Sequence, residues 1–209
     1  MHLRNSADRP TPSGPDAAVR PDSSMPTSML TPMPSTSSTP KPQKDELAVL
    51  PALPTRLDIP TISVHAEVGT VSVTQTSTGQ ATLAPPESTW DDLSRAYWWD
   101  ERSAPSNPSS GTTFIIGHTC HSEGCSSVFN RLQEIQQGAL VRVATSKGVF
   151  TYRVFKRQSY LKSEITNVDD VYRDVPNRLV LVTCKLRADG AAQTDNFVAW
   201  ATLESIEPS

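Results

Sequence analysis

The segment Val180-Leu181-Val182-Thr183-Cys184, near the C-terminus, combines a predicted buried strand with a candidate nucleophile. Residues 179–182 form a short apolar run rich in β-branched side chains, which predicts a buried strand. Cys184 ends this run, and a turn-prone segment over 185–190 follows it. A cysteine in such a place is often a small buried hydrophobic residue, but loops carried on a rigid scaffold also hold catalytic groups. Cys184 is therefore a candidate nucleophile whose role depends on a partner elsewhere in the chain.

The N-terminal region differs in composition from the rest of the 209 residues. Nine of the 18 prolines lie before Asp45, in a stretch that is mostly Ser, Thr and Pro. Such a segment cannot bury enough apolar surface to offset the entropy lost on ordering it. We therefore predict a disordered Pro/Ser/Thr-rich tail or stalk over residues 1–46. Residues 47–209 are long enough to bury one core and are predicted to form a single folded domain.

The charge and hydropathy of the chain exclude several classes of protein. The net charge of −3 and the pI near 5.8, with no basic stripe, argue against nucleic acid as a partner. No run approaches 18 apolar residues, and residues 1–20 contain no hydrophobic stretch. The sequence as given therefore predicts neither a transmembrane helix nor a signal peptide. Either the protein is intracellular, or an anchor precedes Met1.

Alternation of apolar and polar residues predicts further half-buried strands. These segments, together with one continuous apolar run over 112–116, are residues 56–60, 62–68, 71–73, 140–143, 149–155 and 197–203. The turn Ser146-Lys147-Gly148 would join two of them into a hairpin. Helices are predicted over 91–96 with Thr89 as the cap, over 126–135, and as one turn over 168–172. Many short strands with few helices favour a mostly β fold, a barrel or a sandwich.

Two aromatic residues and one histidine stand out beside the predicted strands. Trp98 and Trp99 are predicted to pack in the core or at its rim rather than to bind a ligand. His118 follows the apolar run over 112–116, as Cys184 follows its own run. An imidazole that holds or relays a thiol proton makes cysteine a useful nucleophile. The alternative for His118 is a packed, hydrogen-bonded core histidine. The pair can meet only if the fold brings its two strands side by side.

Several segments, taken in order along the chain, resemble the sortase family. They are Pro54–Pro60, Gly117-His118, Val128–Leu132, Gly138 before a strand, and Val180–Cys184. The last is similar to the family's Thr-Leu-x-Thr-Cys, with Val180 in the first Thr position. The resemblance covers about residues 52–204 and is strongest to the actinobacterial class F type, which is also preceded by a Pro-rich stalk.

The resemblance implies a fold and an activity. The expected fold is an eight-stranded β-barrel with short helices, and the expected activity is that of a cysteine transpeptidase without a cofactor. Cys184 would attack the Thr-Gly carbonyl of a Leu-Pro-x-Thr-Gly-type sorting signal. The thioacyl-enzyme would then be resolved by an amine, from a peptidoglycan precursor or a pilin lysine. His118 would protonate the leaving amine and deprotonate the incoming one.

The resemblance also implies partners and a location. The partners would be surface proteins that carry a sorting signal, together with the amine acceptor, and we expect the protein to be a monomer. Members of the family are anchored in the membrane and act outside the cytoplasm. We therefore expect this protein at the cell surface, held by a segment that precedes Met1.

The chain departs from the family pattern at the group that stabilises the oxyanion. The family places an arginine just before the final strand, which corresponds here to Gln193 or Thr194. Neither residue is cationic. Arg187 is the only arginine in the sequence after Cys184, so it is the candidate substitute, and the alternative is an ordinary solvated side chain. The loss of one oxyanion donor costs on the order of 10²–10³ in rate.

Two further cysteines, Cys120 and Cys125, lie just after His118. Three readings remain open for them. A disulfide would fit a protein outside the cytoplasm. A metal site would use both cysteines with His121, and His118 as a further ligand. In the third, both thiols are free.

A zinc-bound His118 could not act as an acid or base, so the metal site and the catalytic role of His118 exclude each other. Two alternative functions therefore remain beside the transpeptidase. One is a non-catalytic barrel that binds a cell-surface peptide. The other is a zinc-stabilised interaction module.

Overall fold

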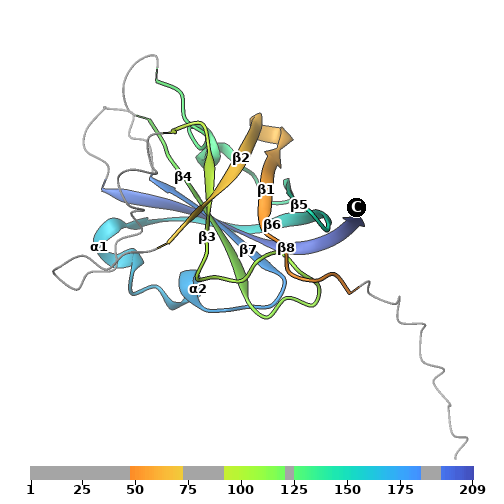
Figure 1. The fold of residues 1–209 in the computed structure, drawn as a ribbon. Coiled ribbons are helices and arrows are strands. Elements are labelled where there is room, and N and C mark those ends of the chain that lie inside the picture. The colour runs from red at the N-terminus through yellow and green to blue at the C-terminus, as the bar shows by residue number, and fades with distance from the viewer. Residues whose placement is uncertain (1–47, 73–91, 121–124, 185–193) are drawn as a thin grey trace, which may run out of the picture. The chain divides into compact units, whose positions relative to one another are not determined.

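The computed structural model describes residues 48–72, 92–120, 125–184 and 194–209. Within these ranges, eight strands form one closed barrel (Figure 1). The strands are β1 (Pro54–Ile59), β2 (Val64–Val71), β3 (Ala96–Trp99), β4 (Thr112–Gly117), β5 (Leu140–Thr145), β6 (Gly148–Leu161), β7 (Arg178–Cys184) and β8 (Asp195–Pro208). Short helical segments are η1 (Pro60–Ile62), η3 (Leu132–Glu134), α1 (Lys162–Ile165) and α2 (Asp169–Tyr172). The predicted eight-stranded barrel with short helices is confirmed.

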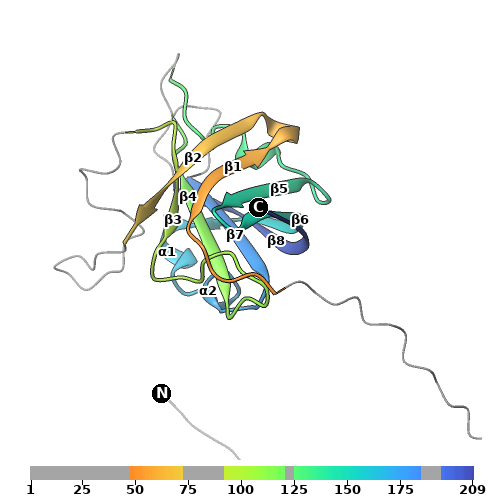
Figure 2. The same cartoon turned by 45° about the vertical axis from the view of Figure 1, so that its right-hand side comes forward.

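The strand order brings together segments that are far apart in the sequence. Around the barrel the order is β1-β2-β3-β4-β7-β8-β6-β5, and β5 pairs with β1 to close it. A closed barrel leaves no unpaired edge that could recruit another chain. β4 and β7 pair in parallel and lie side by side in both views (Figures 1 and 2). The carboxyl ends of these two strands therefore meet at the same end of the barrel.

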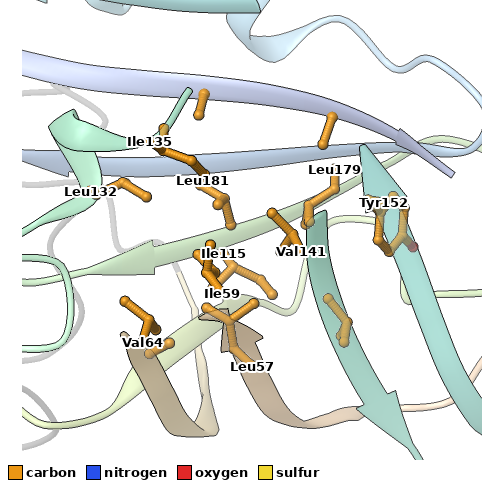
Figure 3. Close-up of a cluster of buried hydrophobic side chains, with 14 of the residues drawn as sticks. Leu57, Ile59, Val64, Ile115, Leu132, Ile135, Val141, Tyr152, Leu179 and Leu181 are labelled. Carbon is orange, nitrogen blue, oxygen red and sulfur yellow. The ribbon is translucent and has the colours of Figure 1, made fainter. Parts of the chain in front are cut away.

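The interior of the barrel holds the main hydrophobic core. Leu57, Ile115, Val141, Leu179 and Leu181 are each 0% exposed, and their side chains converge between the strands (Figure 3). Successive residues of a strand point to opposite faces, so every second residue contributes to this core. Residues 179–182 are apolar at every position because β7 is buried on both of its faces.

A second hydrophobic cluster lies on the other face of the same strands. Val180, Val182, Val198 and Trp200 contribute from β7 and β8, while Ile165 from α1 and Val171 from α2 cover them. Trp98 packs in the interior and Trp99 in the second cluster, and both are buried, as predicted.

The hairpin prediction is confirmed, and most predicted strands are found, several of them longer than the patterns indicated. Pro60 and Ile62, at the ends of two predicted strands, instead lie in the 3-10 turn η1. The strand predicted over 71–73 is not found as such, because only Val71 belongs to β2, Ser72 lies outside any strand, and Val73 lies outside the described residues. The run over 179–182 lies within β7, and the predicted hairpin is β5 and β6, joined after Thr145. The last strand extends to Pro208, and the predicted helical turn over 168–172 corresponds to α2.

The predicted helix over 91–96 is wrong. Asp92 accepts a hydrogen bond from the main-chain N–H of Ser94 at 3.0 Å, and Arg95 N donates to Asp92 O, which makes a turn. β3 then begins at Ala96. An aspartate that bonds the backbone two residues on favours a turn over a helix. Asp91 and Thr89 lie outside the described residues.

The predicted helix over 126–135 is also wrong, since the segment forms turns and the single 3-10 turn η3. Its main-chain donors bond to other segments: Val128 N donates to Leu93 O at 2.8 Å, and Phe129 N to His118 O at 3.0 Å. Each backbone N–H has one hydrogen to donate, so these bonds replace helical ones. The apolar residues are nevertheless buried as expected, because Phe129, Leu132 and Ile135 are each 0% exposed.

The chain divides into two compact units, Met1–Pro42 and Gln43–Ser209, and the described residues all lie in the second. The predicted disordered tail over 1–46 lies outside the described residues and stays a prediction. In the part of the chain that is described, no helix combines the length and hydrophobicity that a membrane span requires.

Candidate active site

The parallel pairing of β4 with β7 sets the position of the two candidate catalytic residues. The register runs without interruption from Thr112 beside Arg178 to Ile116 beside Val182. β4 ends at Gly117, one residue after the last printed pair, and His118 follows it directly, while Cys184 ends β7. If the same register continues for two more residues, it brings His118 level with Cys184, so the two residues that sequence reasoning singled out follow neighbouring, parallel strand ends.

The alternation of side chains places Cys184 on one face of the sheet, and the same spacing continued one residue beyond β4 assigns His118 to that face. Val180 and Val182 belong to the second cluster, so Cys184, two residues further on, continues their face. Phe114 and Ile116 belong to the same cluster, and His118 follows them with the same spacing. Cys184 is a free thiol, and both Cys184 and His118 are half-buried.

Two threonine hydroxyls tie the ends of the strands together. Thr119 Oγ1 donates to the carbonyl of Cys184 at 2.8 Å, and Thr183 Oγ1 donates to the carbonyl of Gly117 at 2.8 Å. The two hydroxyl oxygens lie 2.5 Å apart, and both side chains are buried. These crossed bonds connect the residue after His118 to the backbone of Cys184, and the residue before Cys184 to the backbone before His118. They hold the two strand ends in register.

The loop after His118 is held by a second set of contacts around Asn130. Asn130 Oδ1 accepts from the main-chain N–H of Cys120 at 2.8 Å, and its Nδ2 donates to Cys125 O at 3.3 Å. Ser127 Oγ lies 2.8 Å from His118 O and 2.5 Å from Asn130 Oδ1, so its one hydrogen serves either acceptor. The carbonyl of His118 also accepts from Phe129 N. The backbone of His118 is therefore fixed from the 125–130 segment.

Gly117 permits this packing. A Cβ at position 117 would lie 2.7 Å from both Cε2 of Phe129 and Cγ1 of Val128. These distances are well inside van der Waals contact, which for carbon atoms is about 3.5–4.0 Å. Only glycine lets the two side chains close against the strand end just before His118.

Cys120 and Cys125 form a disulfide, with their Cα atoms 5.7 Å apart. Both sulfurs are used in this bond, so the zinc site that the sequence left open lacks its two thiolate ligands. His121, its third proposed ligand, lies outside the described residues. Among the residues that are described, no group of three His, Cys, Asp or Glu side chains is arranged to hold a metal ion.

Burial sets the ionisation of His118. Desolvation disfavours the charged imidazolium and lowers the pKa of His118 below its ordinary value of 6.5. At neutral pH the imidazole is therefore mainly neutral, which is the form that can accept a proton. A thiol beside a neutral imidazole is suited to nucleophilic attack on a carbonyl carbon.

The predicted oxyanion group lies mostly outside the described residues. Arg187 and Gln193 lie outside the described residues, so the role assigned to Arg187 stays a prediction. Thr194 is described, and its hydroxyl donates to the carboxylate of Asp195 at 2.9 Å.

Sequence reasoning missed four residues around the site: Thr119, Ser127, Asn130 and Asn196. The first three act on the backbone of the His118 loop, and Asn196 pairs with Cys184 across β7 and β8. The Val128–Leu132 segment was singled out for its resemblance to a family motif, but nothing in the sequence pattern indicated a structural role for Asn130 within it. Only the three-dimensional pairing identifies these residues.

Comparison with known proteins agrees with this geometry. The model of the family described as Sortase domain matches residues 57–204. A search of curated protein sequences found no significant match. Similar solved structures include sortase A from Listeria monocytogenes, at 18% identity and a TM-score of 0.53, covering 76% of this chain and 91% of that one.

Two further sortase structures have the same fold. Sortase C-1 from Actinomyces oris has 18% identity and a TM-score of 0.54, over 72% of this chain and 73% of that one. Sortase A from Corynebacterium diphtheriae has 15% identity and a TM-score of 0.55, over 77% and 64%. With the family match extending over most of the chain, from β1 to β8, the protein belongs to the sortase family, whose members are cysteine transpeptidases.

Proposed function

We propose that this sortase cleaves a Leu-Pro-x-Thr-Gly-type sorting signal with Cys184 as the nucleophile and His118 as the acid and base. The observation that supports this most is the β4–β7 register, whose continuation sets His118 beside Cys184 on one face. The lowered pKa of His118 supports it independently, because a neutral imidazole can take the thiol proton.

The reaction begins with transfer of the Cys184 proton to His118. The thiolate attacks the Thr carbonyl of the Thr-Gly bond, and a carbon–sulfur bond forms as the carbonyl π electrons move to oxygen. The oxyanion then collapses, the carbon–nitrogen bond breaks, and His118 protonates the departing glycine amine. An acceptor amine attacks the thioester, gives its proton to His118, and releases the Cys184 thiolate. The net result is exchange of one amide for another.

Membership of the sortase family supports a proposed acceptor and a proposed location. Sortases act at the Gram-positive cell surface on proteins that carry sorting signals. The amine of a peptidoglycan precursor or a pilin lysine is the proposed acceptor. Membrane anchoring, a monomeric state and assignment to class F stay predictions.

The test is cleavage of a fluorogenic Leu-Pro-x-Thr-Gly peptide, with and without an added amine nucleophile. We expect the wild-type protein to release the glycine fragment and to join the Thr carbonyl to the added amine. Cys184→Ala should abolish both reactions, and His118→Ala should do nearly the same, because the two groups act as one unit and their losses do not add. A thiol-directed vinyl sulfone should label Cys184 in the wild-type protein, and the labelling should depend on His118. Full cleavage by Cys184→Ala would refute the proposed mechanism.

A further inference from the structure

Asn196, the β8 residue directly opposite Cys184, occupies the position from which a side chain can reach the reacting carbonyl oxygen. The antiparallel register of β7 and β8 runs unbroken from Arg178 beside Thr202 to Cys184 beside Asn196. Val198 and Trp200 belong to the second cluster, so the alternation along β8 turns Asn196 to that face, the one that Cys184 shares. We propose that Asn196 donates a hydrogen bond to the oxyanion formed on attack by Cys184. This inference rests on the proposed role of Cys184 as the nucleophile.

The spacing that is general for directly opposed residues fits this role. Directly opposed residues of an antiparallel pair have Cβ atoms about 4.5–5.5 Å apart. The oxyanion is bonded to the carbon that Cys184 Sγ attacks, so it forms within the same short span. The primary amide of asparagine offers two N–H donors at the end of a short side chain. A donor on the neighbouring strand can therefore approach the oxygen from beside the nucleophile without crossing the sheet.

The amide of Asn196 is available for this bond, whereas the neighbouring hydroxyl is engaged. Among the described residues, no hydrogen bond involves the side chain of Asn196. Thr194, two residues earlier on the same face, already donates its hydroxyl hydrogen to Asp195 at 2.9 Å. The half-buried amide of Asn196 thus meets the two requirements of an oxyanion donor, which are position and a free N–H.

The apolar surroundings of Asn196 strengthen the hydrogen bond that its neutral amide would donate to the oxyanion. Val182 and Val198, which precede Cys184 and follow Asn196 on this face, are 1% and 0% exposed. A hydrogen bond to a developing negative charge is stronger beside such apolar groups than in water. A fixed amide dipole aimed at the oxyanion also needs no rearrangement during the reaction. An asparagine can therefore supply part of the stabilisation that the family obtains from an arginine, whose position here is taken by Gln193 or Thr194.

The test compares acylation of Cys184 with its alkylation in the full-length protein. Acylation by p-nitrophenyl acetate passes through an oxyanion, but alkylation by iodoacetamide does not. The variants are Asn196→Ala and Asn196→Leu, which remove the donor at reduced and at similar size, and Asn196→Gln, which keeps it on a longer side chain. Ser205→Ala, an exposed position further along β8, is the control, and the Cys184→Ala background is subtracted throughout.

We expect Asn196→Ala and Asn196→Leu to lower the acylation rate about 10²-fold or more, the usual loss for one oxyanion donor. The alkylation rate should stay within about twofold of the wild-type rate, because the thiol and its base are unchanged. Asn196→Gln should recover part of the loss, and Ser205→Ala should have no effect. Peptide cleavage should show the same loss in kcat with little change in KM.

The remaining outcomes separate this inference from its rivals. Acylation by Asn196→Ala at the wild-type rate would overturn it, and so would an equal loss of alkylation, since that would indicate a disturbed strand rather than a lost donor. Arg187→Ala and Thr194→Val are assayed in parallel, and a loss confined to either one would assign the donor there instead. If the wild-type protein did not cleave any sorting peptide, the proposed function would fail. The acylation comparison with p-nitrophenyl acetate would still decide the role of Asn196.

Discussion

Replacement of Asn130 by alanine tests whether the loop after His118 is held by this single side chain. Asn130 Oδ1 accepts from the main-chain N–H of Cys120 at 2.8 Å, and Cys120 is 8% exposed. The substitution leaves that N–H buried without its acceptor, which costs about 1–3 kcal/mol. For a chain of this size, each kcal/mol shifts Tm by about 2–4 °C. The expected fall in Tm is therefore about 2–12 °C.

The activity should fall as well, because the same network positions His118. With Asn130 gone, the segment from Cys120 to Ser127 loses the side chain that connects its two ends, while the disulfide remains. A displacement of a catalytic group by about 1 Å can cost 10²-fold in rate, so we expect kcat to fall about 10- to 100-fold with little change in KM. The measurements are differential scanning calorimetry and steady-state cleavage of the sorting peptide.

Two further variants make the comparison specific. Asn130→Asp keeps the acceptor oxygen for Cys120 N and should retain more of both Tm and kcat than Asn130→Ala. Arg131→Ala removes an exposed ion pair with Glu134 from the next residue of the same loop, where a contribution of only about 0–1 kcal/mol is expected. Wild-type Tm and kcat in Asn130→Ala would refute the reasoning, as would a loss no larger than that of Arg131→Ala.

Four other predictions concern the same site and the tail. Burial lowers the pKa of His118, so between the folded pKa and pH 6.5 the unfolded chain binds a proton that the folded chain does not. The contribution of His118 to the free energy of unfolding is then fully present above pH 6.5 and is lost as the pH falls through the folded pKa. The free energy of unfolding from chemical denaturation should therefore vary less with pH in His118→Gln than in the wild-type protein. Identical pH dependences would contradict this prediction. Gly117→Ala should displace the Phe129 ring and lower both Tm and kcat, which are measured by the assays described for Asn130→Ala. A wild-type Tm in this variant would show that the loop can adjust to the added methyl group. Intact mass spectrometry without reductant should give a protein mass two hydrogen atoms below that of the fully reduced protein, because Cys120 and Cys125 are bridged. Cys184 should remain open to alkylation, and alkylation of all three thiols would exclude the bridge. Deletion of residues 1–46 should leave Tm within about 2 °C of the wild-type value, and a large fall would show that the tail packs on the barrel. Deletion of residues 1–53 should lower Tm, because it removes the backbone pairing of Val49 with Asn107.

Elements whose signals are local could be predicted from the amino-acid sequence. The continuous apolar run over 179–182 predicts β7 because a strand buried on both faces needs apolar residues at every position. Alternation predicts β1 and β2, and the turn at 146–148 predicts the β5–β6 hairpin, since these patterns lie within a few residues. Cys184 and His118 could be singled out for the same reason, because each follows a recognisable strand.

The two wrong helices show where local patterns stop being sufficient. The apolar spacing over 126–135 predicts burial, and the residues are buried, but the backbone donors of Val128 and Phe129 bond to Leu93 and His118. Which acceptor a main-chain N–H finds depends on segments that are distant in the sequence. No local window contains that information.

The assembly of the site depends on contacts between strands that are distant in the sequence. The antiparallel pairing of β7 with β8 sets Asn196 beside Cys184, and the parallel pairing of β4 with β7 brings the strand end before His118 to the same end of the barrel. The crossed hydroxyl bonds of Thr119 and Thr183 depend on that same register. A sequence specifies which side chains each strand carries, but register and strand order are settled by packing the whole core. Neighbours of Cys184 across the sheet are therefore a property of the closed barrel and not of any segment in it.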